Sequence, residues 1–484
     1  MSPQEVKSKA VSAVKALGIR TLITLLIRIG SSLIMARLLF ANDYGAFAVA
    51  AWILGMGTFL SDVGLAGALV RQHTKPTRDE EFTVFISQQV IAAVIVVLVI
   101  TVGPALAGVS NMAASQRGIL YVMALNLFNN SLRVIPLMAL ERELKFKTIA
   151  KIELTQSVVN TALNIFLAWL GWGAWALAIG SVAGATATTV GVWIASPWKP
   201  GGVYRFGIVK RLAKFGIAFQ LNALMPTLLS GWIPILVGKL LGLTAVGFVN
   251  WANSLASVPM MLSAVLNRVA FPAYARLQDH PETLGNYVKT AARRLMALMT
   301  LVVPLGVLAC PVAIPVLFKA RWAPAIPLVQ WFSIDVMLGT LLGVLASVQN
   351  ATGFAADRLW VATATGLARW GVGFLAIRWF GIAGVGPTVV LITLTELMST
   401  TWLIQVRNGK SAGLMTAVLS PVLRIALMIG AAWGLSQLVP GVHPYVQSFI
   451  SVGCFVTLLV VTEVLTRGRM VTEELMAIVR MVRK

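Results

Sequence analysis

Apolar residues in this chain occur in long runs of about 18 to 25 residues, with short polar segments between them. A helix rises about 1.5 Å per residue, so a run of this length crosses the roughly 30 Å hydrocarbon core of a bilayer. The pattern predicts an all-α integral membrane protein with about fourteen transmembrane helices. We place these helices at residues 14–40, 44–70, 82–109, 113–140, 152–171, 173–195, 217–241, 245–272, 292–318, 325–350, 358–380, 382–406, 417–439 and 443–466.

Two short segments indicate an internal repeat. RLLFANDYG (37–45) follows the first predicted helix, and KLLGLTAVG (239–247) follows the seventh with the same spacing. The offset between them also superimposes six predicted helices on six others, which predicts two bundles related by a pseudo-twofold axis along the membrane normal. The expected organisation is a first six-helix bundle at 1–195, a cytoplasmic amphipathic linker at 196–216, a second six-helix bundle at 217–406, and a final helix pair with a cytoplasmic tail at 407–484.

Composition and charge agree with a membrane location. Of the 484 residues, 58% are hydrophobic and 12% are charged, and the mean hydropathy is +0.84, which excludes a soluble protein. The formal net charge of +22 comes from lysine and arginine residues that cluster in alternate loops. This positive-inside pattern predicts a multi-pass membrane protein with both termini in the cytoplasm, and it argues against binding of nucleic acid. The loops on the outer side of the membrane, away from the basic cytoplasmic loops, are too short to form an external domain.

The residues that usually bind metals or perform catalysis are sparse. Cys310 and Cys454 lie within apolar runs, and the three histidines are far apart, so we predict no metal and no cofactor. The segment Gly409–Ser411 is similar to the end of a phosphate-binding loop, but Ile404 stands where that loop needs a glycine. An enzyme acting on membrane lipids would need convergent acidic groups on a sizeable outer loop, so we predict a transporter and not an enzyme.

Arg28 shows most clearly why charges inside the spans need an explanation. In RTLITLLIRIGSSLIMARLL (20–39), Arg20 and Arg37 lie about 25 Å apart along a helix and reach opposite membrane surfaces. Arg28 lies between them, near the middle of the membrane. A guanidinium there costs several kcal/mol unless a partner or water compensates it.

Arginines outnumber acids at this depth. The arginines are Arg28, Arg133, Arg268, Arg369 and Arg424, and the acids are Asp62, Asp335 and Glu396. The excess of guanidinium predicts a hydrated cavity that receives an anion. Arginine suits phosphate because its planar fork donates to two oxygens in parallel. We therefore assign the five arginines to a substrate-binding cavity and the three acids to possible ion coupling.

Each assignment has a structural alternative. Arg268 lies a few residues before a predicted helix end, from which its side chain can reach water. Arg369 and Arg424 can instead pair with Glu396 or with backbone carbonyls. Pro136 frees a backbone carbonyl that Arg133 can satisfy.

Asp62 lies in the small-residue run SDVGLAG, where it can assist close helix packing or pair with an arginine. Asp335 and Glu396 are the preferred candidates for proton or sodium coupling.

Several segments resemble one family. MARLLFANDYGAFAVAAWILGMGTFLSDVGLAGALVRQ (35–72) resembles the first two helices of the polysaccharide transporter family, the Wzx-type oligosaccharide flippases of the multidrug/oligosaccharidyl-lipid/polysaccharide exporter superfamily. Residues 136–153, 268–279 and 318–330 extend the resemblance over most of the chain. It is similar in particular to the exopolysaccharide and colanic-acid flippases.

The resemblance implies a flippase that moves undecaprenyl-pyrophosphate-linked oligosaccharide repeat units from the inner to the outer leaflet of the bacterial cytoplasmic membrane. It also implies alternating access around a cationic central cavity, in which Arg28 and Arg268 match the kind of arginine proposed to hold the pyrophosphate. The implied partners are this substrate, membrane lipids, and polysaccharide polymerase and export machinery. The alternative is an ion-coupled multidrug exporter of the same superfamily, but organic cations call for carboxylates in the cavity and not for an excess of arginine.

Overall fold

The computed structural model describes residues 20, 23–62, 64, 65, 67, 69, 76–260, 274, 277, 280–408, 413–439, 443–466, 471–474, 476 and 477. The side chains of residues 59, 61, 62, 214–223, 281, 355 and 444 lie outside this description. Helices joined by short turns make up nearly all of these ranges, and no β-strand occurs in them. The helical character predicted from the apolar runs is therefore confirmed for this part of the chain.

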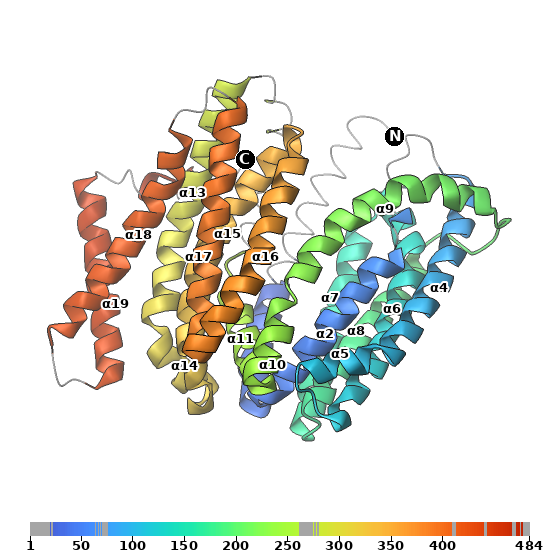
Figure 1. The fold of residues 1–484 in the computed structure, drawn as a ribbon, viewed down its shortest axis with the longest axis horizontal. Coiled ribbons are helices and arrows are strands. Elements are labelled where there is room, and N and C mark those ends of the chain that lie inside the picture. The colour runs from blue at the N-terminus through green and yellow to red at the C-terminus, as the bar shows by residue number, and fades with distance from the viewer. Residues whose placement is uncertain are drawn as a thin grey trace. The chain divides into compact units, whose positions relative to one another are not determined.

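The chain forms two compact units, Met1–Gly247 and Phe248–Lys484. The first unit contains a helix at 23–38. Its other helices are α2 (Ala41–Asp62), α4 (Arg78–Thr101), α5 (Gly103–Val109), α6 (Ala114–Arg142), α7 (Phe146–Trp169), α8 (Ala174–Ala195), α9 (Phe206–Leu229), the π-helical turn η1 (Ile233–Val237), α10 (Gly238–Leu241) and the first turn of α11 (Leu243–Ala256). Helix α6 packs on both α4 and α8 (Figure 1).

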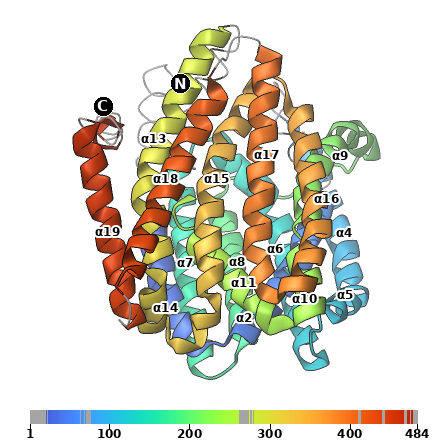
Figure 2. The same ribbon diagram turned by 60° about the vertical axis from the view of Figure 1, so that its left-hand side comes forward.

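The second unit continues with the rest of α11, followed by α13 (Pro281–Leu308), α14 (Cys310–Phe318), η2 (Ala320–Ala325), α15 (Ile326–Ala351), α16 (Ala355–Phe380), η3 (Gly381–Gly384), α17 (Val385–Asn408), α18 (Leu414–Gln437) and α19 (Pro444–Leu465). Helix α15 packs against both α13 and α17, and α18 packs on α13 and α19 (Figure 2). The buried core contains Met296 from α13, Leu338 and Leu341 from α15, and Val418 from α18.

Two local features occur once in each unit, while the repeat itself stays a prediction. The turn between α7 and α8 has Gly173 at φ 54° and ψ −132°, and the turn after α16 has Gly381 at φ 58° and ψ −140°. Only glycine adopts such a backbone conformation readily. A proline also ends a long helix in each unit: Pro104 opens α5 after α4, and Pro311 opens α14 after α13.

The two glycines at equivalent repeat positions contact each other. A Cβ atom at Gly45 on α2 would collide with the backbone of Leu243, and a Cβ atom at Gly247 on α11 would collide with the backbone of Ala41. Each added Cβ atom would also lie 3.0–3.2 Å from the backbone nitrogen of the other glycine. The first turn of α11 therefore approaches α2 to a distance that only glycine permits.

Close packing of α7 on α8 has the same origin. A Cβ atom at Gly180 would collide with the Asn164 side chain, and one at Gly184 would lie 2.9 Å from the Cβ of Asn160. This pair is one of the small-residue motifs visible in the sequence. It lets the two backbones approach closely.

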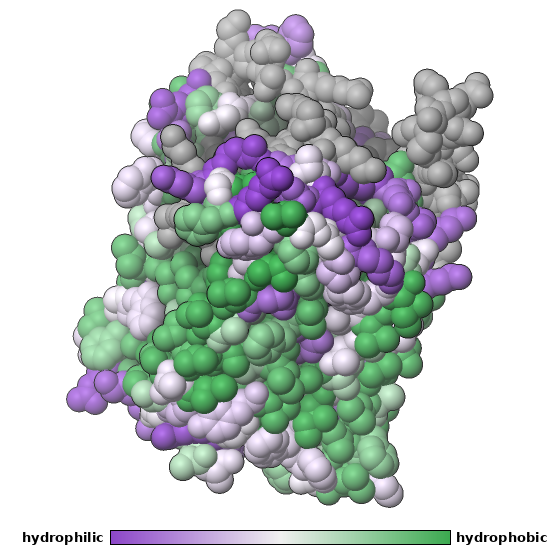
Figure 3. All heavy atoms as spheres, turned by 90° about the vertical axis from the view of Figure 1, so that its right-hand side faces the viewer, coloured by the Kyte–Doolittle hydropathy of each residue, from purple (hydrophilic) through white to green (hydrophobic). Residues whose placement is uncertain are grey.

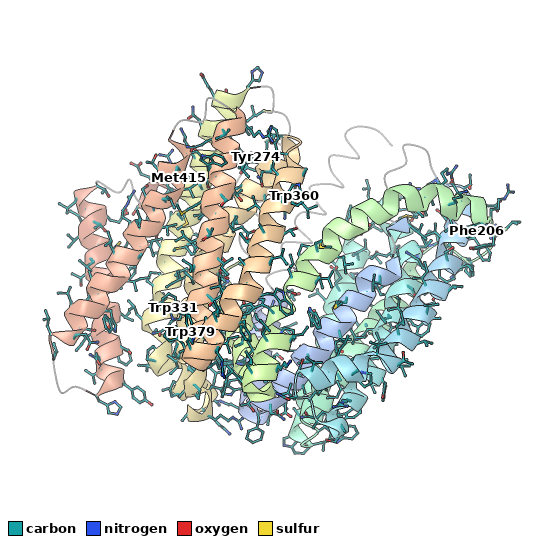
Figure 4. The ribbon with its side chains drawn as sticks, viewed as in Figure 1. Phe206, Tyr274, Trp331, Trp360, Trp379 and Met415 are labelled. Atoms are coloured by element: carbon teal, nitrogen blue, oxygen red, sulfur yellow. The ribbon has the colours of Figure 1, made fainter. Side chains whose placement is uncertain are left out.

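The described residues include nine helical segments that are long and apolar enough to cross a membrane. Exposed tryptophans mark both ends of one of them, with Trp360 75% and Trp379 71% exposed on α16 (Figure 4). Their separation of 19 residues corresponds to about 28 Å, the thickness of a hydrocarbon core. One face of the first unit is broadly hydrophobic, with hydrophilic residues gathered toward the end where α4 and α9 begin (Figure 3). The protein is a multi-pass membrane protein, whereas the count of fourteen helices stays a prediction.

The linker segment is attached to the beginning of α4. The Asp79 carboxylate accepts a hydrogen bond of 3.0 Å from Val203 N and pairs with Arg205. Glu80 pairs with Arg211. Helix α9 begins at Phe206 and packs on α2 and α4, so the predicted boundary at residue 216 lies within a continuous helix of the first unit.

Candidate functional site

A charged cluster lies among three helices of the second unit. The Nη2 atom of Arg369 on α16 lies 3.4 Å from Oε2 of Glu396 on α17 and donates a hydrogen bond of 3.1 Å to Oγ1 of Thr393. The carboxylate of Asp335 on α15 lies beside the Thr393 hydroxyl and within electrostatic range of Arg369. The structure therefore brings together three residues that the sequence analysis selected separately. The predicted alternative that Arg369 pairs with Glu396 is confirmed.

This cluster lies near the middle of the membrane. Arg369 follows Trp360 by nine residues and precedes Trp379 by ten, which places it about 14 and 15 Å from the two aromatic ends of α16. The Oδ1 atom of Asp335 and the Nε atom of Arg369 are buried without a hydrogen-bond partner. Two carboxylates share one guanidinium here, so a proton or a small cation on Asp335 would neutralise the remaining negative charge.

A second charged cluster lies in the first unit. The Nε atom of Arg20 lies 3.2 Å from Oε2 of Glu153 on α7. Arg133 on α6 lies within electrostatic range of the same carboxylate and donates a hydrogen bond of 3.1 Å to Oδ1 of Asn130. Glu141 on α6 also lies within electrostatic range of Glu153. Two guanidinium groups thus gather at Glu153, and their remaining N–H donors suit a further anion.

Glu153 was missed by the sequence analysis because of a helix boundary. The apolar run beginning at residue 152 puts Glu153 at the very start of a predicted span, where a carboxylate reaches water easily. In the structure α7 begins at Phe146, so Glu153 lies seven residues, about 10 Å, into the helix. The segment before residue 152 is basic, and hydropathy alone does not distinguish a polar helical turn from a loop. The start of α7 at Phe146 was therefore not predicted.

The carbonyl freed by Pro136 has a different partner from the one expected. Pro136 cannot donate to Leu132 O, and the indole Nε1 of Trp193 on α8 donates to that oxygen at 3.0 Å. Arg133 is therefore not used to satisfy the proline kink. Its guanidinium stays with the Glu153 cluster.

The remaining predicted residues are distributed as follows. The Arg28 side chain is exposed on the helix at 23–38, eight residues after Arg20 in the sequence. Arg424 is exposed on α18 and makes no hydrogen bond or ion pair with the residues that the structure describes. Arg268 and the Asp62 side chain lie outside the described residues. Within the described ranges, no three His, Cys, Asp or Glu side chains are grouped so as to hold a metal ion.

Comparisons with known proteins identify relatives over most of the chain. The model of the family described as polysaccharide biosynthesis protein matches residues 34–327, more than half of the 484 residues. The teichuronic acid biosynthesis protein TuaB of Bacillus subtilis (strain 168) is 24% identical over 61% of this chain and 62% of its own length. The lipopolysaccharide biosynthesis protein WzxC of Escherichia coli (strain K12) is 23% identical over 72% and 69%, and the succinoglycan biosynthesis transport protein ExoT of Rhizobium meliloti (strain 1021) is 24% identical over 70% and 68%.

Solved structures share the fold. The lipid II flippase MurJ in an inward closed conformation superimposes with a TM-score of 0.74 at 11% identity, covering 93% of this chain and 98% of that chain. An inward-facing multidrug resistance MATE family transporter of the MOP superfamily gives a TM-score of 0.62 at 15% identity, covering 82% and 98%. The chain therefore belongs to the polysaccharide biosynthesis protein family, and it shares its fold with the lipid II flippase MurJ and with a MATE family transporter.

Proposed function

We propose that this protein moves undecaprenyl-pyrophosphate-linked oligosaccharide repeat units from the inner to the outer leaflet of the bacterial cytoplasmic membrane, for surface or exopolysaccharide synthesis. The observation that carries the proposal is that two guanidinium groups, those of Arg20 and Arg133, gather at Glu153 in the first unit, in a chain of the polysaccharide biosynthesis family. Polysaccharide polymerase and export machinery would receive the product.

Arginine side chains would hold the pyrophosphate during transport. Arg28 and Arg133 belong to helices of the first unit and retain the role assigned from the sequence, together with Arg268 and Arg424. A guanidinium remains charged at any cellular pH and donates two parallel hydrogen bonds to phosphate oxygens. In this mechanism, alternating access around a cationic cavity exposes these groups first to the cytoplasm and then to the outer face.

The second-unit cluster would couple transport to an ion. Asp335 and Glu396 share Arg369, so binding and release of a proton or sodium ion at Asp335 would change the net charge of the cluster by one. The membrane potential would assist export as well. A headgroup with about two negative charges gains roughly 4 to 5 kcal/mol on leaving a cytoplasm that is 100 mV negative.

Transport of organic cations is the alternative function, and the same acids favour it. Carboxylates within apolar helices attract such cations, and MATE transporters share the fold. If this alternative were correct, a deletion strain would become sensitive to cationic drugs. We expect no such sensitivity.

Lipid-linked repeat units in a deletion strain provide the main test. We expect them to accumulate on the cytoplasmic leaflet and to return to normal when the wild-type gene is restored. Arg28→Ala should restore less than about a tenth of the flux, because removal of one charge-assisted contact costs about 1.5–3 kcal/mol. Arg378→Ala, at the exposed end of α16, is the matched control and should restore flux fully. Normal leaflet distribution in the deletion strain would refute the proposed function.

A further inference from the structure

We propose that Glu153 is an internal counter-ion, which pairs with Arg20 and Arg133 in the empty transporter and is displaced when the phosphate groups of the lipid-linked substrate bind. The inference rests on the proposed function and adds two residues, Arg20 and Glu153, to the binding site. It also assigns a preference: a ligand with two or more negative charges displaces the carboxylate more effectively than a ligand with one.

The ion pairing around Glu153 leaves arginine N–H donors unused, which allows a phosphate group to replace the carboxylate. The Nε atom of Arg20 is buried 3.2 Å from the Glu153 carboxylate, yet its N–H has no hydrogen-bond acceptor with suitable geometry. Arg133 makes its hydrogen bond to the neutral side chain of Asn130. A guanidinium carries five N–H donors, so both arginines keep donors that phosphate oxygens can use.

Accessibility also permits displacement. The side chains of Arg20 and Glu153 are 29% and 33% exposed, so a ligand reaches the pair without unfolding the helices. Glu141, near the end of α6, repels the Glu153 carboxylate and weakens its hold on the arginines. Without Glu153, Arg20 would lose its ion pair and Arg133 its neighbouring carboxylate, which is costly in the empty state.

Polar side chains also occur on the helix at 23–38, which follows Arg20 in the sequence. Thr24 and Arg28 lie four residues apart on one face of this helix, about 6 Å along its axis. The Thr24 Oγ1 atom is buried without a hydrogen-bond partner. A phosphate group released from Arg20 would therefore meet a hydroxyl donor and then a second guanidinium.

Binding of polyprenyl pyrophosphate and polyprenyl monophosphate to the purified full-length protein in lipid nanodiscs tests the inference. For Glu153→Gln we expect affinity to rise about tenfold, because the ligand no longer competes with a carboxylate. The rise should be larger for monophosphate, so the preference for pyrophosphate shrinks. Glu143→Gln is the matched control, because Glu143 pairs with Lys145 on the exposed surface and should leave both affinities unchanged.

The outcomes separate the inference from the proposed function. If the wild-type protein binds pyrophosphate but Glu153→Gln binds both ligands as the wild type does, or more weakly, the counter-ion role is refuted and the flippase proposal stands. If the wild type binds neither ligand, the proposed function itself fails. If thermal melting shows that Glu153→Gln does not fold, Glu153→Asp replaces it. Its shorter carboxylate should raise monophosphate affinity by a smaller factor, and unchanged affinity would refute the role.

Discussion

At the scale of single residues, the position of an ion pair in the membrane determines how much it contributes to stability. The Arg369–Glu396 pair lies near the middle of the membrane and is shared with Asp335, so neither partner can reach bulk water alone. The Arg205–Asp79 pair lies at a helix end, where water competes with it and each contact contributes little.

Removal of one partner of the central pair should therefore be costly. We expect Arg369→Gln to lower the free energy of unfolding by about 3–5 kcal/mol, because Glu396 and Asp335, both half-buried, then lose the guanidinium that they share. The double variant Arg369→Gln/Glu396→Gln should recover most of the loss. Chemical unfolding in detergent measures both values, and a single variant as stable as the wild type would contradict the expectation.

The indole of Trp193 offers a second residue-level prediction. Trp193→Phe keeps the aromatic packing against Phe85 and Trp198 but leaves Leu132 O without its donor, which should cost about 1–2 kcal/mol of stability. Adding Pro136→Ala restores a backbone N–H four residues after Leu132. The second substitution should therefore rescue the first, and additive losses in the thermal unfolding of the double variant would argue against this hydrogen bond.

At the scale of helices, the close approach of α2 and α11 depends on glycine. Gly247→Ala would put a Cβ atom against the backbone of Ala41, so we expect a loss of folded yield and of at least about 2 kcal/mol of stability. Gly430→Ala on α18 is the matched control, since no atom lies within 4 Å of its Cβ position. This control should be neutral or stabilising by up to about 1 kcal/mol. Equal effects at the two positions would contradict the packing argument.

Hydrophobic periodicity predicts helices well but not their ends. The run at 82–109 is divided in the structure into α4 and α5, and the run at 292–318 into the end of α13 and α14, because Pro104 and Pro311 interrupt the backbone hydrogen bonds. The start of α7 lies six residues before the predicted start at residue 152. That difference moved Glu153 from a predicted helix end to the interior of a helix.

At the scale of the whole molecule, each unit gathers charged groups in a different way. In the first unit the guanidinium groups of Arg20 and Arg133 lie at Glu153, and in the second two carboxylates share the Arg369 guanidinium. This division suits a transporter that binds an anionic substrate in one unit and a coupling cation in the other.

Asp335→Asn tests the division of roles in proteoliposomes. The wild type should respond both to an imposed membrane potential and to a gradient of protons or sodium ions. The variant should respond to the potential alone, because an amide neither binds a proton at neutral pH nor attracts a cation strongly. An undiminished response of the variant to each ion gradient would exclude Asp335 as the coupling residue.

The sequence by itself determined the helical membrane character, because this follows from composition and from the length of the apolar runs. Only the tertiary structure decided which charges meet. Arg369 meets Glu396, Arg20 meets Glu153, and Trp193 takes the carbonyl that Pro136 frees. Such pairs join different helices, so they depend on where each helix begins and which neighbours it packs against, and no spacing along the chain specifies either.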